Sequence, residues 1–155
     1  MSASASEADL TYEIWDVFTD RPFAGNPLAV VFGADALSTE QMQTLAREFN
    51  LSETIFVQAP RDPAHSARVR IFFPTAGIPE DPATGSAAAI FAAELAARGL
   101  LAGPETKLTI AQGVEMGRPS RIDMTVLTNE NKLSAVRIAG QAMRVAKGTV
   151  TLPGT

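Results

Sequence analysis

Several residue types that enzymes commonly use are absent or scarce in this chain of 155 residues. It contains no cysteine and a single histidine, His65. Without cysteine there are no disulfides, no thiol catalysis and no thiolate metal sites. One histidine also leaves little room for a Ser–His–Asp triad and none for a multi-histidine metal site. We therefore expect no metal, and we interpret His65, which lies in a polar loop, as exposed and inert.

Basic surface and long apolar runs are also scarce. The chain has 13 Lys and Arg against 17 Asp and Glu, which gives a net charge of -4. No basic face is available to neutralise phosphates, so we expect no nucleic-acid partner. The most apolar run, residues 86–97, contains Glu94 and is too short to span a bilayer. The opening residues also lack the pattern of a secretory signal. We expect a soluble, cytoplasmic protein with no membrane partner.

The residues that are present predict one domain from residue 10, after a disordered polar tail over residues 1–9. Ser38 and Gln41 form a capping box that starts a first helix, and Asn50 ends it. Apolar and alternating runs predict strands at 12–18, 28–32, 53–58, 68–73, 107–112, 121–127 and 133–138, with a final pair around 143–145 and 149–152. A hairpin turn is predicted at 129–131.

A second helix is predicted over residues 83–98, with Asp81 as its N-cap, Pro82 in its first turn and Gly99 at its end. Apolar residues cover most of its circumference, which indicates an enclosed position. Many strands around one enclosed helix predict an α+β fold. We expect a curved antiparallel sheet wrapped around a central helix, with the first helix outside.

Three segments carry candidate chemistry. The small residues around Gly85 open the second helix, and free N–H groups at a helix start attract a carboxylate or phosphate. The alternative is that Asp81 only caps the helix. Glu53 at the start of an apolar strand is either a general base in a cleft or a solvated strand end. Arg118, in a glycine-containing loop, either holds an anion or forms a surface ion pair.

At these segments the sequence resembles the PhzF-like phenazine-biosynthesis isomerases, which have the diaminopimelate epimerase fold. The resemblance is carried by four stretches in family order: DVFTDRPFAGNP at 16–27, SETIFV at 52–57, GIPEDPATGS at 77–86 and QGVEMGRPS at 112–120. It covers the chain from about residue 12 onward.

The resemblance implies acid–base chemistry without a cofactor on a small carboxylate substrate. Glu53 of the SET motif would move the proton, and Asp81 of the DPATGS motif would be a further active-site acid. The implied substrate-binding residues are Ser52, Asn26, Thr84, Gly85, Ser86, Gln112, Gly113 and Arg118. Relatives in the wider fold use two cysteines as opposed bases, a route that this cysteine-free chain excludes.

The chain departs from the family pattern after residue 72. Family members have two similar domains, and a histidine-bearing FAGHP motif follows at this point. Here the chain passes directly to residues 73–81, which resemble the start of the second domain's helix. His65 does not match the missing motif. We expect a single hybrid domain over residues 10–155, built from the front of the first domain to about 72 and the back of the second from about 73.

A single hybrid domain leaves the family's interdomain site half open, which weakens electrostatic catalysis. We therefore expect a homodimer that brings two Asp81 helix starts face to face. The leading interpretation is a PhzF-like isomerase or epimerase. The alternative is a catalytically inactive remnant, or a small-anion-binding domain, that keeps the helix-start site.

Overall fold

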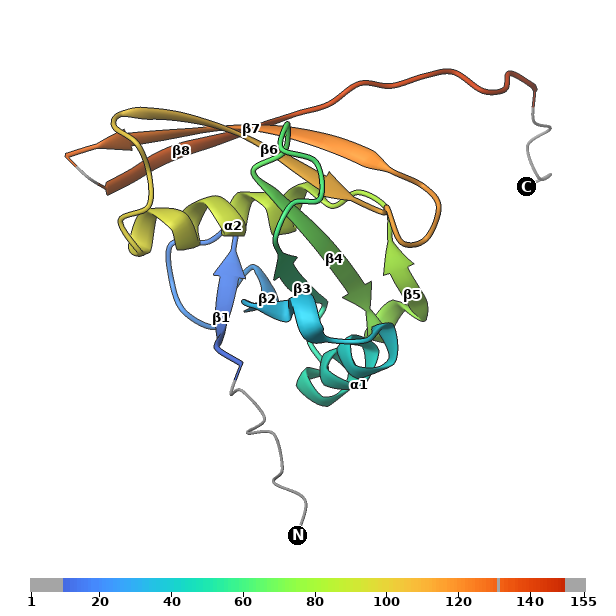
Figure 1. The fold of residues 1–155 in the computed structure, drawn as a ribbon. Coiled ribbons are helices and arrows are strands. Elements are labelled where there is room, and N and C mark those ends of the chain that lie inside the picture. The colour runs from blue at the N-terminus through green and yellow to red at the C-terminus, as the bar shows by residue number, and fades with distance from the viewer. Residues whose placement is uncertain (1–9, 131, 150–155) are drawn as a thin grey trace, which may run out of the picture.

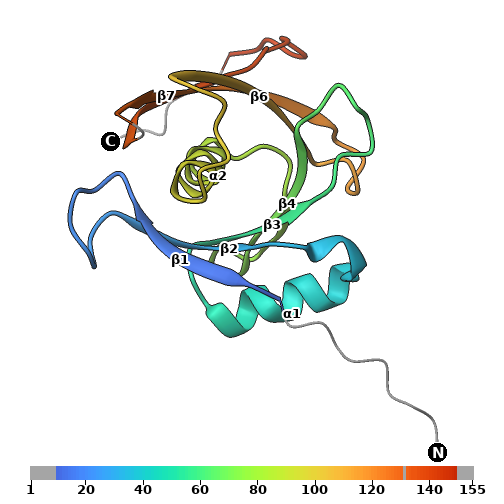
Figure 2. The same ribbon diagram turned by 60° about the vertical axis from the view of Figure 1, so that its left-hand side comes forward.

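The computed structural model describes residues 10–130 and 132–149. Its strands form one sheet that curls around helix α2, while helix α1 packs on the outside of the curl (Figures 1 and 2). The helices are α1 (Thr39–Phe49) and α2 (Gly85–Ala97). The strands are β1 (Tyr12–Val17), β2 (Asn26–Val31), β3 (Glu53–Gln58), β4 (Ala67–Phe73), β5 (Ile78–Asp81), β6 (Glu105–Gln112), β7 (Ser120–Asn129) and β8 (Lys132–Ala139).

The strand order is β1-β2-β3-β4-β6-β7-β8, and β5 pairs with β4 beside this path. The α+β class and the enclosed helix are confirmed, but the sheet is mixed rather than antiparallel throughout. The pairs β2–β3 and β4–β6 are parallel. Their connections contain α1 and α2 respectively, because a parallel pair needs a long crossover to return the chain to the same end of the sheet.

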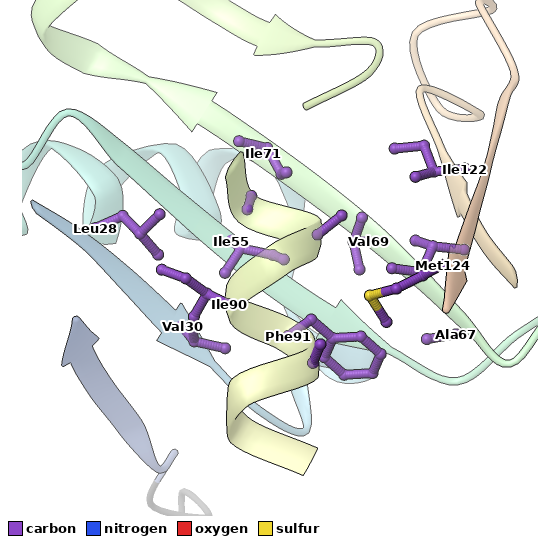
Figure 3. Close-up of a cluster of buried hydrophobic side chains, with 14 of the residues drawn as sticks. Leu28, Val30, Ile55, Ala67, Val69, Ile71, Ile90, Phe91, Ile122 and Met124 are labelled. Atoms are coloured by element: carbon purple, nitrogen blue, oxygen red, sulfur yellow. The ribbon is translucent and has the colours of Figure 1, made fainter. Parts of the chain in front are cut away.

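The main core lies between α2 and the inner face of the sheet (Figure 3). Ile90 and Phe91 of α2 point into side chains from strands on both halves of the sheet, and Ala87 and Ala92 are fully buried. The alanines allow strands to approach the helix from several sides. A second, smaller cluster on the outer face joins α1 to Phe56 and Phe72. Alternate residues of β3 and β4 therefore serve two cores.

Helix α1 follows its sequence signals closely. Ser38 Oγ accepts a hydrogen bond from the Gln41 backbone N–H at 3.2 Å, and the Gln41 side chain accepts one from the Ser38 N–H at 2.9 Å. Asn50 ends the helix in the left-handed region, with φ 51°. The predicted capping box and stop are confirmed.

The predicted start of α2 is wrong. The helix begins at Gly85 with Thr84 as N-cap, whereas Asp81 is the last residue of strand β5, opposite Ile71 of β4. The extended backbone that Pro82 imposes on Asp81 suits a helix N-cap and a strand end equally, and the pairing of Asp81 with Ile71 of β4 decides for the strand end. Strand β5 itself was not predicted.

The C-terminal part of the chain also differs from the prediction. Residues 143–145 form no strand, because no strand of the described chain lies alongside them to complete a ladder. Most of the predicted 149–152 strand lies outside the described residues, as do residues 1–9. The β7–β8 hairpin is confirmed, with Asn129 opposite Lys132, although Asn131 of its predicted turn is not described. Neither described helix is long and apolar enough to cross a membrane.

Candidate active site

Glu53 begins β3 and faces the start of α2. The Ser86 hydroxyl donates to the Glu53 carboxylate, with Oγ 3.0 Å from Oε1 and 2.8 Å from Oε2. Asn26 Nδ2 at the start of β2 donates to Oε1 at 3.1 Å. Strands β2 and β3 are parallel, so their first residues lie at the same edge of the sheet. Glu53 is only 6% exposed, so the interpretation of a solvated strand end is wrong.

Asp81 and Thr84 form a second polar group just before α2. The Thr84 hydroxyl donates to the Asp81 carboxylate. Asp81 is half-buried and Gly85 is exposed, so this corner of the helix start is open to solvent. The first N–H groups of a helix have no intrahelical acceptor and carry the positive end of the helix dipole. The arrangement is chemically suited to receive a carboxylate.

Gln112 fastens this segment to the end of β6. Its side chain is fully buried, and Oε1 accepts a hydrogen bond from the Thr84 N–H at 3.1 Å. Nε2 donates to the Asp81 backbone carbonyl at 2.8 Å and to Thr84 Oγ1 at 3.0 Å. Both ends of the amide are thus engaged by the chain itself. The structure places Gln112 where it holds the helix start, behind the surface that a ligand would touch.

The next residue, Gly113, has φ +73°. A Cβ there would lie 2.4 Å from the Arg118 carbonyl oxygen and 2.9 Å from that of Pro82. Only glycine lets the 113–118 turn approach the DPATGS segment so closely. The Arg118 side chain is exposed, and among the described residues no ion pair includes it. The surface ion pair considered for Arg118 is therefore not present.

A cavity of about 840 Å³ adjoins the start of α2. It is lined by Thr84 and Gly85 on the helix side, by residues 119–123 of the β6–β7 loop and β7, and by residues 138–141 at the end of β8. Inside it Arg121 Nε donates to Asp123 at 3.0 Å. This guanidinium, together with the Thr109 hydroxyl, holds the pKa of Asp123 below its usual value.

The predicted residues fall into two groups. Glu53, Ser86 and Asn26 meet directly, and Ser52 precedes Glu53 as a half-buried residue. Asp81, Thr84, Gln112 and Gly113 form the adjoining group, and Gly85 links the two, whereas Arg118 stands apart on its loop. His65 is not exposed as predicted: its side chain is 20% accessible, and Nδ1 lies 3.7 Å from Asp62 Oδ2.

Sequence reasoning missed a buried ionic network behind this site. Arg70 of β4 donates through Nε and Nη2 to the two carboxylate oxygens of Glu80, at 2.9 and 2.6 Å, and through Nη1 to Thr39 Oγ1 at 2.8 Å. The hydrogen bond with Glu80 raises the pKa of Arg70 further. Arg68 pairs with Glu115 in the 113–118 turn. Two arginines alternating with apolar residues in β4 were the available signal.

A separate set of polar side chains lies at the C-terminal end of α2. Glu94 is fully buried, accepts from Trp15 Nε1 at 3.1 Å and from Arg98 Nε at 2.7 Å, and lies near Glu13. Burial raises the pKa of Glu94, but its hydrogen bonds with Glu13, Arg98 and Trp15 outweigh burial and hold the pKa below its usual value. The pKa of Glu13 is raised, chiefly by its hydrogen bond with Glu94.

Comparison with known proteins places these motifs in a family. The model described as "Phenazine biosynthesis-like protein" (PhzC-PhzF) matches residues 15–76 and 65–148, two ranges that overlap. The chain belongs to this family. The PhzF-family protein of Bacillus anthracis has a similar structure, with a TM-score of 0.63 and 30% identity, over 79% of this chain and 38% of that one. A hydroxyproline epimerase from Agrobacterium vitis shares the fold. It is 14% identical and has a TM-score of 0.55, over 74% of this chain and 38% of that one.

Curated relatives match over shorter stretches. An "Uncharacterized isomerase" of Mesorhizobium japonicum is 53% identical over 87 residues, which is 55% of this chain and 28% of that protein. The "Trans-2,3-dihydro-3-hydroxyanthranilate isomerase" of Pseudomonas aeruginosa is 46% identical over 81 residues, 51% of this chain and 29% of that protein. The matches thus span less than a third of these relatives' length.

Proposed function

We propose that the chain is a PhzF-like isomerase that moves a proton on a small carboxylate-bearing metabolite without a cofactor. The observation that carries this proposal is the buried Glu53 carboxylate, held between Ser86 at the start of α2 and Asn26 at the start of β2. Three of the four family motifs thus meet at one carboxylate. A general base works only when it is held in a fixed place beside the proton it removes.

In this proposal the start of α2 binds the substrate carboxylate. The N–H groups of Gly85 and Ser86 receive it, helped by the helix dipole, while Thr84 and Ser52 line its surroundings. Glu53, next to Ser86, then takes a proton from a carbon near the bound carboxylate, and the Glu53 carboxylic acid, after exchange of that proton with solvent, delivers a proton to another carbon. Ser86 and Asn26 both donate hydrogen bonds to Glu53, and these bonds fix the direction of its carboxylate.

Asp81 is the assisting acid, at the end of β5 just before the helix start. The Thr84 hydroxyl orients its carboxylate, and Gln112 fixes its backbone. Gly113 allows the loop that bears Arg118 to pack against Pro82, and Arg118, exposed on that loop, would attract an approaching anion. These groups bind the substrate's negative charge or transfer its proton. The proposed reaction therefore uses only the chain's own side chains and backbone N–H groups.

The proposed site is completed by a second copy of the chain. We propose that this is a hybrid domain, with its front from one family domain and its back from the other. The double match of residues 65–76 supports a junction at two similar strands. Family sites between two domains exclude water, whereas the cavity beside α2 here is open. Two copies with their Asp81 helix starts face to face would restore the enclosure.

The test is proton exchange measured by ¹H NMR in deuterated buffer. The first probe is trans-2,3-dihydro-3-hydroxyanthranilate, the compound in the names of several relatives. Glu53→Gln is expected to slow turnover by about 10²-fold or more, the usual contribution of a positioned base. Asp81→Asn should also slow it, while the matched control Glu48→Gln, on the exposed face of α1, should not.

Two results would overturn the proposal. If Glu53→Gln and Asp81→Asn both leave turnover unchanged, the assignment of the proton-transfer residues is wrong. If the wild-type chain does not turn over the probe but is stabilised by it against heat, the chain is an anion-binding domain and not an isomerase.

A further inference from the structure

Strands β5 and β6 meet end to end along one edge of β4, because β3 occupies the other edge. Strand β6 runs parallel to β4 and ends at Gln112, opposite Val69. Strand β5 runs antiparallel to β4 and ends at Asp81, opposite Ile71. The two strands therefore run toward each other and stop on either side of Arg70. Strand β5 leads from this point into the start of α2 and β6 leads into the β6–β7 turn, so both segments around the proposed site leave the sheet here.

Arg70 bonds strand β5 at this point from the outer face of the sheet, which it shares with Phe72. Its Nε and Nη2 donate to the two carboxylate oxygens of Glu80 at 2.9 and 2.6 Å, and only 5% and 8% of the two side chains are exposed. A guanidinium that donates to both oxygens of a carboxylate fixes its direction as well as its distance. Successive residues of a strand point to opposite faces, so Glu80 on the outer face directs Asp81 to the face where the Thr84 hydroxyl donates to it. The position of Glu80 therefore sets the orientation of Asp81.

Glu115 bonds the β6–β7 turn to the same face of the sheet. Its carboxylate pairs with Arg68, which lies two residues before Arg70 and so on the same face of β4. It also lies 3.3 Å from Arg61 Nη2 and 3.9 Å from Arg70 Nε. The turn that bears Glu115 packs against the backbone of Pro82, just after the end of β5. The ion pairs of Glu115 therefore limit how far the turn can move away from this contact.

We propose that Arg70 is a positioning residue of the site. Through Glu80 it orients Asp81. Together with Arg68 it holds Glu115 and, with it, the β6–β7 turn. We name Arg68, Arg70, Glu80 and Glu115 the β4 ionic cluster; none of them lines the cavity beside α2, so they act from behind the site. This inference rests on the role of Asp81 in the proposed function, but its first readout uses no substrate.

The test replaces the Arg70–Glu80 ion pair by apolar side chains. Arg70→Met alone leaves Glu80 buried and unpaired, so Glu80→Leu is added to restore the stability of the fold. Methionine and leucine pack against each other without a fixed direction, unlike a guanidinium and a carboxylate. The double variant therefore keeps the fold but removes the orienting contact. Arg98→Met with Glu94→Leu is the matched control, because it removes an arginine–glutamate pair at the other end of α2.

Amide hydrogen exchange, measured by NMR, is the first readout. The Thr84 N–H donates to the Gln112 side chain at 3.1 Å, and the Arg118 N–H donates to the Gly113 carbonyl at 2.9 Å, so each segment held by the cluster has one reporter. We expect both N–H groups to exchange about tenfold faster or more in the Arg70 double variant, and neither to do so in the control. Exchange at wild-type rates, or equally faster exchange throughout the sheet, would overturn the proposal.

Turnover of the probe compound is the second readout and separates the two parts of the cluster. The Arg70 double variant disturbs Asp81, so we expect kcat to fall by about tenfold or more, since a misplacement of about 1 Å can cost about 10²-fold. Glu115→Gln loosens only the turn that bears Arg118, so we expect KM to rise by about threefold with kcat unchanged. Equal changes of both constants in the two variants, or none in either, would overturn the proposal. If wild type does not turn over the probe, the proposed function fails, and the exchange rates alone decide whether the cluster positions the helix start.

Discussion

Replacement of Gln112 by leucine tests whether one amide fixes the start of α2. Leucine preserves the side-chain volume, so little of the effect comes from a cavity. The Thr84 N–H and the Asp81 carbonyl, bonded to Gln112 at 3.1 and 2.8 Å, would lose their partner. A buried polar group left without its hydrogen bond costs about 1–3 kcal/mol. Two such groups predict a loss of about 2–6 kcal/mol in the free energy of unfolding, measured by urea titration.

Gln58 provides the matched control. It is a buried glutamine that donates one hydrogen bond, to the Ala34 carbonyl at 3.0 Å, while its own Oε1 has no partner within the described residues. Gln58→Leu leaves one carbonyl unpaired but also removes a buried oxygen that nothing satisfies, so we expect a loss of only about 0–2 kcal/mol. If Gln112→Leu costs no more than Gln58→Leu, the clamp account of Gln112 is refuted.

Three further changes test other parts of the structure. Gly25→Ala places a Cβ 2.0 Å from the Val17 carbonyl oxygen at φ +70°, so we expect a lower thermal midpoint by several degrees, and an unchanged midpoint would contradict the turn geometry. Arg70→Met should cost about 3–5 kcal/mol in urea because it leaves Glu80 buried and unpaired, and Glu80→Leu added to it should recover most of that loss. The lowered pKa of Glu94 means that its stabilising contribution is present above its ordinary value of 4.5 and is lost as pH falls through the folded value. Glu94→Gln should therefore be less stable than wild type at pH 7, with a gap that narrows below pH 4.5; a constant gap would contradict the assignment.

Local signals predicted those elements whose ends are set by neighbours in sequence. Ser38 and Gln41 start α1 through their mutual capping hydrogen bonds, and Asn50 ends it by turning the backbone into the left-handed region. Each signal acts within a few residues of the chain. The composition of residues 86–97 predicted an enclosed helix because alanine-rich apolar surface has no other stable place. The four family motifs also named the residues that the structure gathers at the start of α2.

Non-local contacts account for what the sequence did not predict. Asp81 before Pro82 reads locally as a helix start, but pairing of β5 with β4 makes it a strand end. The Arg70–Glu80 pair joins β4 to β5, ten positions apart, and the hydrogen bonds of Gln112 with Thr84 link residues 28 positions apart. The strand expected at 143–145 does not form because, among the described residues, no strand lies beside it to complete a ladder.

The proposed reaction depends above all on Glu53 as the group that moves the proton. The most direct measurement is incorporation of deuterium from solvent into the probe compound by wild type, Glu53→Gln and Glu48→Gln, followed by ¹H NMR at equal protein concentration. We predict incorporation by wild type and Glu48→Gln and a rate at least about 10²-fold lower for Glu53→Gln. Equal rates for all three proteins would contradict the assignment of the site.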